Sequence, residues 1–475
     1  MHQNYCERNI KSTMSSAITL KGCYTVKPIE PTWSGCISLT ECDQVGFMTH
    51  VPLLYFYRPP QNWLTSPTKI ATILKHSLSR VLMHFYLLAG RLRSKENFRF
   101  DLECNAKGVE FIEAESSSTL SDLGDFSSSS NNYYRYLFPH VDYTLPIHEL
   151  PLLLIQLTKF KCGDISISVL ISHAVVDGQS TSHFLNEWAQ LARGEPLKRV
   201  PCLDRTMLHG KKPCNSVNEW KFNEPPVLLG NSDGKVEESK KKTRVEKIKL
   251  NKAQVEKLRK IANESWNKHS NDRGFSRYET IAGHMWRSAC KARGHKNEQP
   301  TMLGVIVDWR SRVKPSLPKE YFGNAVYDLM ATSLAGDLIS KPLGYASSKI
   351  KETIEKMNDE YVRLMTEYLK KLDDLTNFQN LHEIVSGNIV PFYQNPNLGV
   401  VSWLTLPFHK LDFGWGNELY MEPGIHDMLE GESFILPSSH DDGSLMIYIC
   451  LQEVYMDAFK RHFYEDLELE TLSKL

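Results

Sequence analysis

A histidine and an aspartate stand four positions apart at His173 and Asp177, and Gly178 follows directly. The run 165–172 before them is rich in β-branched residues and alternates in part between apolar and polar types, which predicts a buried strand. Residues 180–193 place apolar side chains at helical spacing. The pattern therefore predicts a histidine between a strand and a helix, where a rigid scaffold can hold a general base at the edge of a cavity.

The same six residues also allow a purely structural interpretation. A histidine beside apolar residues is more often a hydrogen-bonded core residue than a catalytic one. On a helix, residues four apart share a face, but in a turn between strand and helix the side chains of His173 and Asp177 need not touch. The choice between the two interpretations depends on the rest of the chain.

Two further motifs bear on that choice. One consists of Asp412, Phe413, Gly414, Trp415 and Gly416. Its two glycines and two aromatic residues predict a tight, packed loop with a structural role. The other begins at Asp308-Trp309-Arg310 and continues at Tyr321-Phe322-Gly323-Asn324. A buried carboxylate has to be paired, and Arg310 is suited to hold Asp177 through a bidentate contact.

The composition limits the class of protein. The chain has 475 residues with 56 Lys and Arg against 56 Asp and Glu. Zero net charge argues against a nucleic-acid or anionic-membrane binder. The ten cysteines form no zinc-binding spacing, which predicts mostly reduced, buried thiols and no metal site. Without a signal-peptide core or a run of roughly 18 apolar residues, we expect a soluble, cytoplasmic protein, and the absence of heptads favours a monomer.

Strands and helices alternate along the chain, which predicts the α/β class. The length favours two large domains. We expect a flexible N-terminal extension over 1–17, a domain over 18–200 that contains His173, a crossover linker over 201–244, and a domain over 245–475 that contains the Asp412 motif. The charged part of the linker is interpreted as a solvated loop. Helices are expected over 252–263, 278–292 and 347–375.

The order and spacing of these motifs resemble those of the plant BAHD acyltransferases, which transfer an acyl group from a coenzyme A thioester to an alcohol or an amine. The resemblance extends from Ile18 to the C-terminal helix. It implies two domains of mixed sheets flanked by helices, each like chloramphenicol acetyltransferase, with a solvent tunnel between them. His173 would lie in the middle of the tunnel. Acyl-CoA would be a co-substrate, and no cofactor would be bound permanently.

The resemblance also implies a mechanism. His173 would take the proton of the acceptor as it attacks the thioester carbon, which contributes about 10²–10⁴-fold to the rate. The oxyanion needs aimed donors, and the indole of Trp403 is the candidate donor or pocket wall. No acyl-enzyme is required. Asp177 would point away from the cavity toward Arg310 and support the motif together with Gly178, and the Asp412 motif would be structural as well.

For coenzyme A, the resemblance points to a helix of the second domain. The candidate residues are Ser276, Arg287, Lys291 and Arg293. The alternative for each of them is a solvated position on the helix surface.

The acceptor is inferred from departures within the family. Members that accept shikimate carry an arginine where this chain has Asn388 and a threonine where it has Val401, so an anionic acceptor is not expected. The stretches 28–35 and 43–52 resemble the spermidine hydroxycinnamoyl transferases. We therefore expect transfer of a hydroxycinnamoyl group to an amine of spermidine. The expected pocket residues are His50, Tyr55, Asn388, Val401, Trp403, Asp441 and Asp442. For the two aspartates, a plain turn is the alternative.

Two other functions remain open from the sequence. One is an O-acyltransferase for a neutral alcohol. The other is a family-shaped protein that binds metabolites without turnover. The intact His173 and Gly178 argue against the second, because degenerate copies often lose them.

Overall fold

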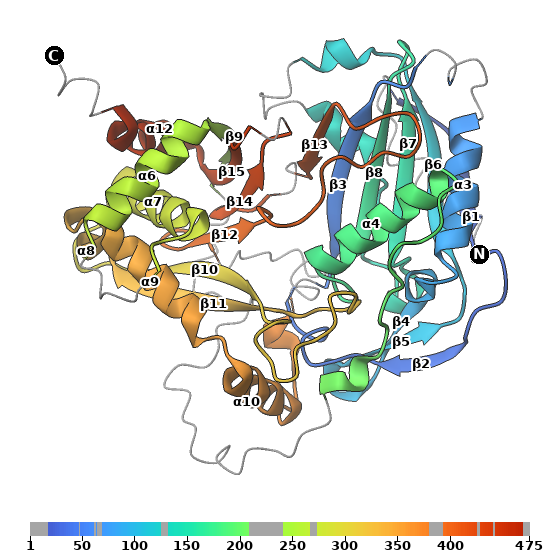
Figure 1. Ribbon diagram of the computed structural model, residues 1–475, viewed down its shortest axis with the longest axis horizontal. Helices are drawn as coiled ribbons and strands as arrows, with labels where there is room; N and C mark the ends of the chain where they lie inside the picture. Colours follow the sequence, from blue (N-terminus) through green and yellow to red (C-terminus); the bar gives the residue numbers. More distant parts are fainter. Residues whose placement is uncertain are drawn as a thin grey trace.

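The computed structural model describes residues 18–46, 48–60, 63, 69–124, 132–208, 241–266, 273–379, 393–424, 428–439 and 442–468. The expected extension 1–17 and residues 209–240 of the expected linker lie outside this part. Two six-stranded mixed sheets form the frame of the molecule (Figure 1). This confirms the predicted α/β class and its pair of mixed sheets flanked by helices.

The first sheet has the strand order β1-β6-β7-β8-β3-β13. Its strands are β1 Ile18–Val26, β6 Val109–Ser116, β7 Leu153–Lys159, β8 Ile165–Ser172, β3 His50–Tyr57 and β13 Tyr420–Pro423. Its main helices are α3 Lys69–Val81 and α4 Gly178–Ala192. A small sheet beside it contains β2 Gly35–Ser38, β4 Arg91–Ser94 and β5 Phe100–Cys104.

Strand β8 lies inside the first sheet and is buried on both faces. Its Ile and Val side chains at 165, 167, 169 and 171 join the core under α3 and α4. The alternate positions carry buried serines at 166 and 168 and point to the other face, since strand side chains alternate. Leu170 shares this second face and joins a separate apolar cluster, so the alternation is only partial.

The second sheet has the order β11-β10-β12-β14-β15-β9. Its strands are β11 Val326–Leu334, β10 Pro300–Asp308, β12 Leu398–Ser402, β14 Glu432–Pro437, β15 Leu445–Gln452 and β9 Thr243–Leu250. Its helices are α6 Lys252–Glu264, α7 Arg277–Ala292, α8 Ala335–Ser340, α9 Leu343–Lys356, α10 Asp359–Lys370 and α12 Glu453–Glu468. In Figure 1, α6, α7 and α9 lie on the side of this sheet that faces away from the first sheet.

The prediction of a single helix over 347–375 is wrong. Two helices lie there, since α9 ends at Lys356 and α10 begins at Asp359. The side chain of Asn358 accepts a hydrogen bond from the Tyr361 N–H at 2.9 Å and caps the new helix. Asparagine at this position favours a helix start over a continued helix, and the apolar period on both sides hides the break.

The two sheets do not follow the expected domain boundary. Strand β13, at residues 420–423, pairs with β3 of the first sheet. Trp403, Phe413 and Trp415 also belong to the core of the first sheet. The expected domain over 245–475 is therefore not confined to the second sheet, because its chain returns to the first sheet before β14.

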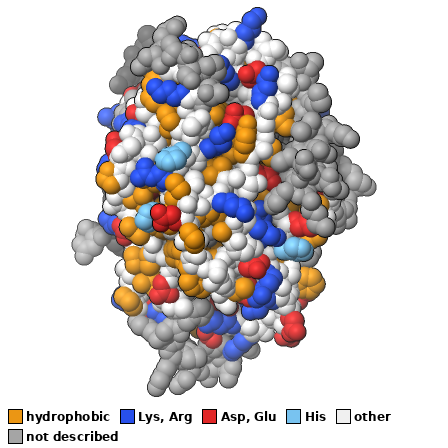
Figure 2. Space-filling model, turned by 90° about the vertical axis from the view of Figure 1, so that its right-hand side faces the viewer, with side chains coloured by type: hydrophobic (Ala, Val, Ile, Leu, Met, Phe, Trp, Pro, Cys, Tyr) orange, Lys and Arg blue, Asp and Glu red, His pale blue; other side chains and the backbone are white. Residues whose placement is uncertain are grey.

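The surface charges and the state of the cysteines agree in part with the expectations from the composition. Lys and Arg side chains are interspersed with Asp and Glu side chains on the face drawn in Figure 2. Within the described part, seven cysteines are free thiols, of which Cys36 and Cys162 are exposed, and Cys23 is disulfide-bonded. Within the same residues, no helix is long and apolar enough to cross a membrane, and no group of side chains suits a metal ion.

Candidate active site

The turn from His173 to Asp177 connects β8 to α4 and is held by its main chain. The His173 N–H donates to the Thr49 carbonyl at 2.8 Å, and the His173 carbonyl accepts from Asn324 Nδ2 at 2.8 Å. His173 keeps accessible surface, whereas residues 174–177 are buried. An accessible imidazole on a fixed turn is the arrangement that a general base requires.

Asp177 is held inside the protein by both of its carboxylate oxygens. Arg310 approaches at 2.7 Å and 2.9 Å through two of its nitrogens. The Ala325 N–H donates at 2.9 Å, and the Ser180 N–H donates at 3.0 Å as Asp177 caps helix α4. Burial alone would raise the pKa of Asp177, but the charge and hydrogen bonds of Arg310 outweigh it and lower the pKa. The ion pair expected from the sequence is therefore present, and it stabilises the ionised form.

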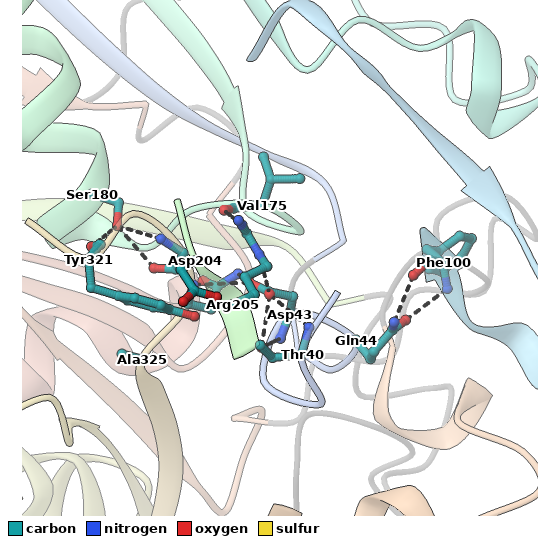
Figure 3. A network of polar contacts seen from close by, with 12 residues as sticks. Thr40, Asp43, Gln44, Phe100, Val175, Ser180, Asp204, Arg205, Tyr321 and Ala325 are labelled. Atoms are coloured by element: carbon teal, nitrogen blue, oxygen red, sulfur yellow. Dashed lines mark hydrogen bonds and ion pairs between the residues drawn. The ribbon is translucent and has the colours of Figure 1, made fainter. Parts of the chain in front are cut away.

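Three motifs that are separate in the sequence meet at the start of α4. Arg310 also contacts Asp308 at 2.8 Å and donates to the Gly323 carbonyl at 3.1 Å. The Ser180 hydroxyl donates to the same carbonyl at 3.0 Å. Figure 3 shows Ser180 beside Tyr321. The loops after β10 and before β11 thus fix the helix that follows His173.

The segment after β12 packs against the same helix start. A Cβ on Gly178 would lie 2.6 Å from Leu406 Cδ1, so glycine permits this close approach. Trp403 is 6% exposed, and its ring lies 4.9 Å from that of Phe408. Trp403 belongs to the hydrophobic cluster that includes the buried part of the His173 turn, and the partly exposed Val401 packs against this cluster. Val401 and Trp403 therefore belong to the same hydrophobic cluster as the turn, although Val401 lies on β12 of the second sheet.

The other expected acceptor residues are not shown to form a pocket here, although the main chain of His50 pairs with Ser172 directly before the turn. Nδ1 of His50 lies 2.9 Å from the Tyr143 hydroxyl and its Nε2 lies 2.7 Å from the Pro151 carbonyl, so both ring nitrogens already have partners. Tyr55 has no exposed surface. Asp442 is exposed and accepts from the Ser444 N–H at 2.8 Å, which is a turn. Asn388 and Asp441 lie outside the described residues.

The motif from Asp412 to Gly416 is packed against the first sheet. One carboxylate oxygen of Asp412 accepts from the Gly414 and Gly416 N–H groups at 2.7 Å and 2.9 Å. Both glycines have positive φ, at 114° and 103°, which favours glycine. The Phe413 ring lies 4.8 Å from that of Trp188 on α4. The Trp415 ring lies 5.5 Å from that of Trp63. These contacts are those of a structural loop.

The four expected coenzyme A residues are spread along helix α7. Ser276 caps its N-terminus through a capping box with Glu279. Arg287, Lys291 and Arg293 lie in or after the last turns, about 15–25 Å away at 1.5 Å per residue. Arg293 is buried, contacts Glu430 at 2.6 Å and donates to the Asn397 carbonyl at 2.8 Å. Its guanidinium is therefore not available for a phosphate in this structure.

Three polar residues near the turn had no assigned role in the sequence. Asp43, Arg205 and Asn324 are buried, and Asp43 is hydrogen-bonded to both of the others. Figure 3 shows Asp43 beside Arg205. Asn324 is the last residue of the Tyr321 motif and Asp43 lies in the 43–52 stretch, so both residues lie in segments whose sequence resembles the family. Arg205 lies in the expected linker, where nothing distinguished it from solvated arginines.

The face of the second sheet that points away from its helices carries two carboxylates. A Cβ on Gly304 or Gly399 would collide with the Tyr393 ring, which therefore lies on this face. The Tyr393 hydroxyl donates to Asp328 at 3.2 Å, and Glu432 pairs with Gly399 in the sheet. Both carboxylates keep some accessible surface, yet burial raises the pKa of Asp328 to about 6 and of Glu432 to about 7. Burial therefore disfavours the ionised forms of both carboxylates.

Two helix-flanked mixed sheets with an accessible histidine at a strand end are the arrangement that the resemblance to the acyltransferases implies. The profile of the Transferase family matches residues 16–466. A hydroxycinnamoyl-CoA:piscidic acid hydroxycinnamoyltransferase from Actaea racemosa is 40% identical over 95% of this chain and 100% of its own length. A shikimate O-hydroxycinnamoyltransferase from Nicotiana tabacum is 38% identical over 94% and 99%.

The solved structure of vinorine synthase matches the fold with a TM-score of 0.70 and 23% identity, over 93% of this chain and 96% of that one. The chain belongs to this transferase family, the BAHD acyltransferases whose motifs it carries. It is an acyl-CoA-dependent acyltransferase, and acyl-CoA is its co-substrate.

Proposed function

We propose that this enzyme transfers a hydroxycinnamoyl group from coenzyme A to a primary amine of a polyamine, with spermidine as the acceptor. The observation that carries the proposed chemistry is that His173 is accessible while the four residues after it in the turn, 174–177, are buried. The hydroxycinnamoyl donor is supported by the names of the relatives from Actaea racemosa and Nicotiana tabacum.

The reaction balances with one histidine as base. The free amine attacks the thioester carbon, and the imidazole of His173 takes one of its protons. The resulting oxyanion requires a donor, for which the indole N–H of Trp403 is proposed. The C–S bond then breaks, the amide forms, and the imidazolium returns its proton to the CoA thiolate. No covalent acyl-enzyme is needed, and Asp177 remains paired with Arg310 throughout.

The amine acceptor is supported by the two carboxylates on the face of the second sheet that points away from its helices. Asp328 and Glu432 lie there, and a bound ammonium would stabilise their ionised forms. A carboxylate acceptor would place a like charge beside these two acids.

For the donor, we propose that the phosphates of coenzyme A lie along α7. Ser276 is at the positive end of this helix, which attracts anions. Arg287 and Lys291 remain candidates, since both keep accessible surface. Arg293 is not proposed as a phosphate ligand, because it forms a buried ion pair with Glu430.

A second candidate is O-acylation of a hydroxy acid. It is favoured by the two relatives above, whose names give piscidic acid and shikimate as acceptors. A neutral alcohol would be a third outcome.

A donor-by-acceptor panel tests these candidates. p-Coumaroyl-CoA, caffeoyl-CoA and feruloyl-CoA are supplied with spermidine, shikimate, piscidic acid and simple alcohols, and products are identified by mass. An amide of spermidine supports the proposal, whereas esters alone would refute the amine acceptor. Release of no free CoA with any acceptor would indicate a protein that binds without turnover. Equal release with and without every acceptor would indicate hydrolysis of the thioester by water.

A further inference from the structure

Asp43 is a buried carboxylate at the centre of a network close to the His173 turn. It lies between β2 and β3 and has no exposed surface. Its Oδ2 accepts from Arg205 Nε at 3.0 Å and from the Thr40 hydroxyl at 2.8 Å. Its Oδ1 accepts from the main-chain N–H and from Nδ2 of Asn324, both at 3.0 Å. Arg205 is 2% exposed, so the ion pair is shielded from solvent.

The two partners of Asp43 each donate to a different carbonyl of the turn. Arg205 Nη2 donates to the Val175 carbonyl at 2.8 Å, and Asn324 Nδ2 donates to the His173 carbonyl at 2.8 Å. Figure 3 shows Arg205 between Asp43 and Val175. The His173 N–H donates to Thr49, at the end of the loop that contains Asp43. The main chain on both sides of Ala174 is thus tied to one carboxylate.

The network also joins distant parts of the chain. Asp43 comes from the loop before β3, Arg205 from the start of the crossover and Asn324 from the loop before β11. Asp177 and Arg310 hold the far end of the same turn. A side chain follows its own Cα, so the network determines where the His173 imidazole can lie.

We propose that Asp43 is a positioning residue of the transfer reaction, acting through Arg205 and Asn324 on the main chain of His173. The proposal rests on the proposed function, because it takes His173 as the base. Loss of Asp43 would release both donors together. A base displaced by about 1 Å costs on the order of 10²-fold in rate.

Glu422→Gln provides the matched control. Glu422 is 1% exposed and forms a 2.7 Å pair with Lys247, as buried as the pair of Asp43 with Arg205. It lies on β13, outside the turn. Asp43→Asn and Glu422→Gln therefore remove the same charge from equally buried pairs. Asn324→Ala is the milder variant, since the main-chain N–H to Asp43 and the ion pair with Arg205 remain.

The experiment compares kcat and KM with p-coumaroyl-CoA and whichever acceptor gives product. We expect kcat to fall about 10²-fold in Asp43→Asn and by a smaller factor in Asn324→Ala, with KM for acyl-CoA unchanged. Glu422→Gln should lower the unfolding temperature but keep kcat. In a His173→Ala background, Asn324→Ala should cause no further loss of CoA release, because no base remains to be positioned.

An unchanged kcat in Asn324→Ala would overturn the proposal, and so would a full additional loss in the His173→Ala background. If Asp43→Asn does not fold, the proposal is still tested by Asn324→Ala, measured alone and in the His173→Ala background. His173→Ala with wild-type activity would refute the proposed base itself and the positioning role with it. That result is distinguishable because it appears in the single variant.

Discussion

His173 and Asp177 belong to one motif but have different surroundings. His173 keeps accessible surface at the end of β8, whereas both carboxylate oxygens of Asp177 are hydrogen-bonded, to Arg310 and to the N–H groups of Ala325 and Ser180. A carboxylate that is fully engaged with a guanidinium has no free acceptor for an imidazole. The spacing of four residues therefore reflects a turn that presents the first residue and anchors the last.

Replacement of Asp177 by Asn should cost stability more than it costs chemistry. It leaves Arg310 buried beside a neutral side chain, and breaking one partner of a buried pair costs about 3–5 kcal/mol. Denaturant unfolding measures this loss. Because the folded pKa of Asp177 is lowered, the stabilisation exists above the unfolded pKa and disappears as the pH falls through the folded pKa. The variant should thus lose less stability than wild type on acidification below about pH 4. A stable, inactive variant would show that Asp177 takes part in the chemistry.

His50 should make the protein less stable in mild acid. Burial lowers its pKa to about 4, against the opposing effect of the hydrogen bond that its Nε2 makes to the Pro151 carbonyl. The unfolded chain takes up this proton near pH 6.5 and the folded protein only near pH 4, so stability falls between these values, by at most about 3 kcal/mol. The melting temperature of His50→Gln should therefore change less than that of wild type between pH 7 and pH 5. Equal changes would mean that His50 titrates normally.

At the scale of elements, patterns with one buried face were predictable. Strand β8 and helix α7 match their expected ranges within one residue at the ends, because a continuous core face imposes a period on the sequence. The break at Asn358 was not predictable, since the apolar period continues across it. The network of Asp43 and Arg205 was not predictable either, because a buried ion pair between residues 162 positions apart has no local period.

The contact between α4 and the segment after β12 can be tested by compensation. Gly178→Ala places a methyl group 2.6 Å from the present position of Leu406 Cδ1. The Leu406 side chain is partly exposed and its end can shift, so the cost should lie near the low end of the overpacking range, about 1 kcal/mol. Leu406→Ala in addition should recover part of this loss, since it removes the colliding atoms. Denaturant unfolding of the two single variants and the double variant gives the coupling energy. Additive effects would mean that the methyl group is accommodated elsewhere.

The whole molecule is organised by chain segments that return from one sheet to the other. The Asp412 motif follows β12 of the second sheet, yet it packs on α4 and β3 of the first. Strand β13 then pairs with β3 before the chain re-enters the second sheet at β14. The motif itself was recognisable in the sequence. Its place in the first core was not, because chain order does not determine which sheet a strand joins.

The two sheets should unfold together, and the ion pair of Lys247 with Glu422 is one of several contacts between them. Lys247 lies on β9 of the second sheet and Glu422 on β13 of the first, 2.7 Å apart, with exposures of 1% and 2% for the two side chains. Calorimetry of the wild type should show one transition whose van't Hoff and calorimetric enthalpies agree. Lys247→Met removes the cation that forms the buried ion pair with Glu422 and should lower stability by about 3–5 kcal/mol.

The double variant Lys247→Met with Glu422→Leu separates charge from packing. Replacing both members of a buried pair by apolar residues is often neutral or stabilising, so the double variant should regain most of the stability lost by Lys247→Met. It should also keep the single transition, since β13 still pairs with β3 and the Asp177–Arg310 pair still connects the sheets. Two separate transitions in the double variant would show that the Lys247–Glu422 ion pair is what couples the sheets. Two transitions already in the wild type would show that the sheets are independent despite their shared core.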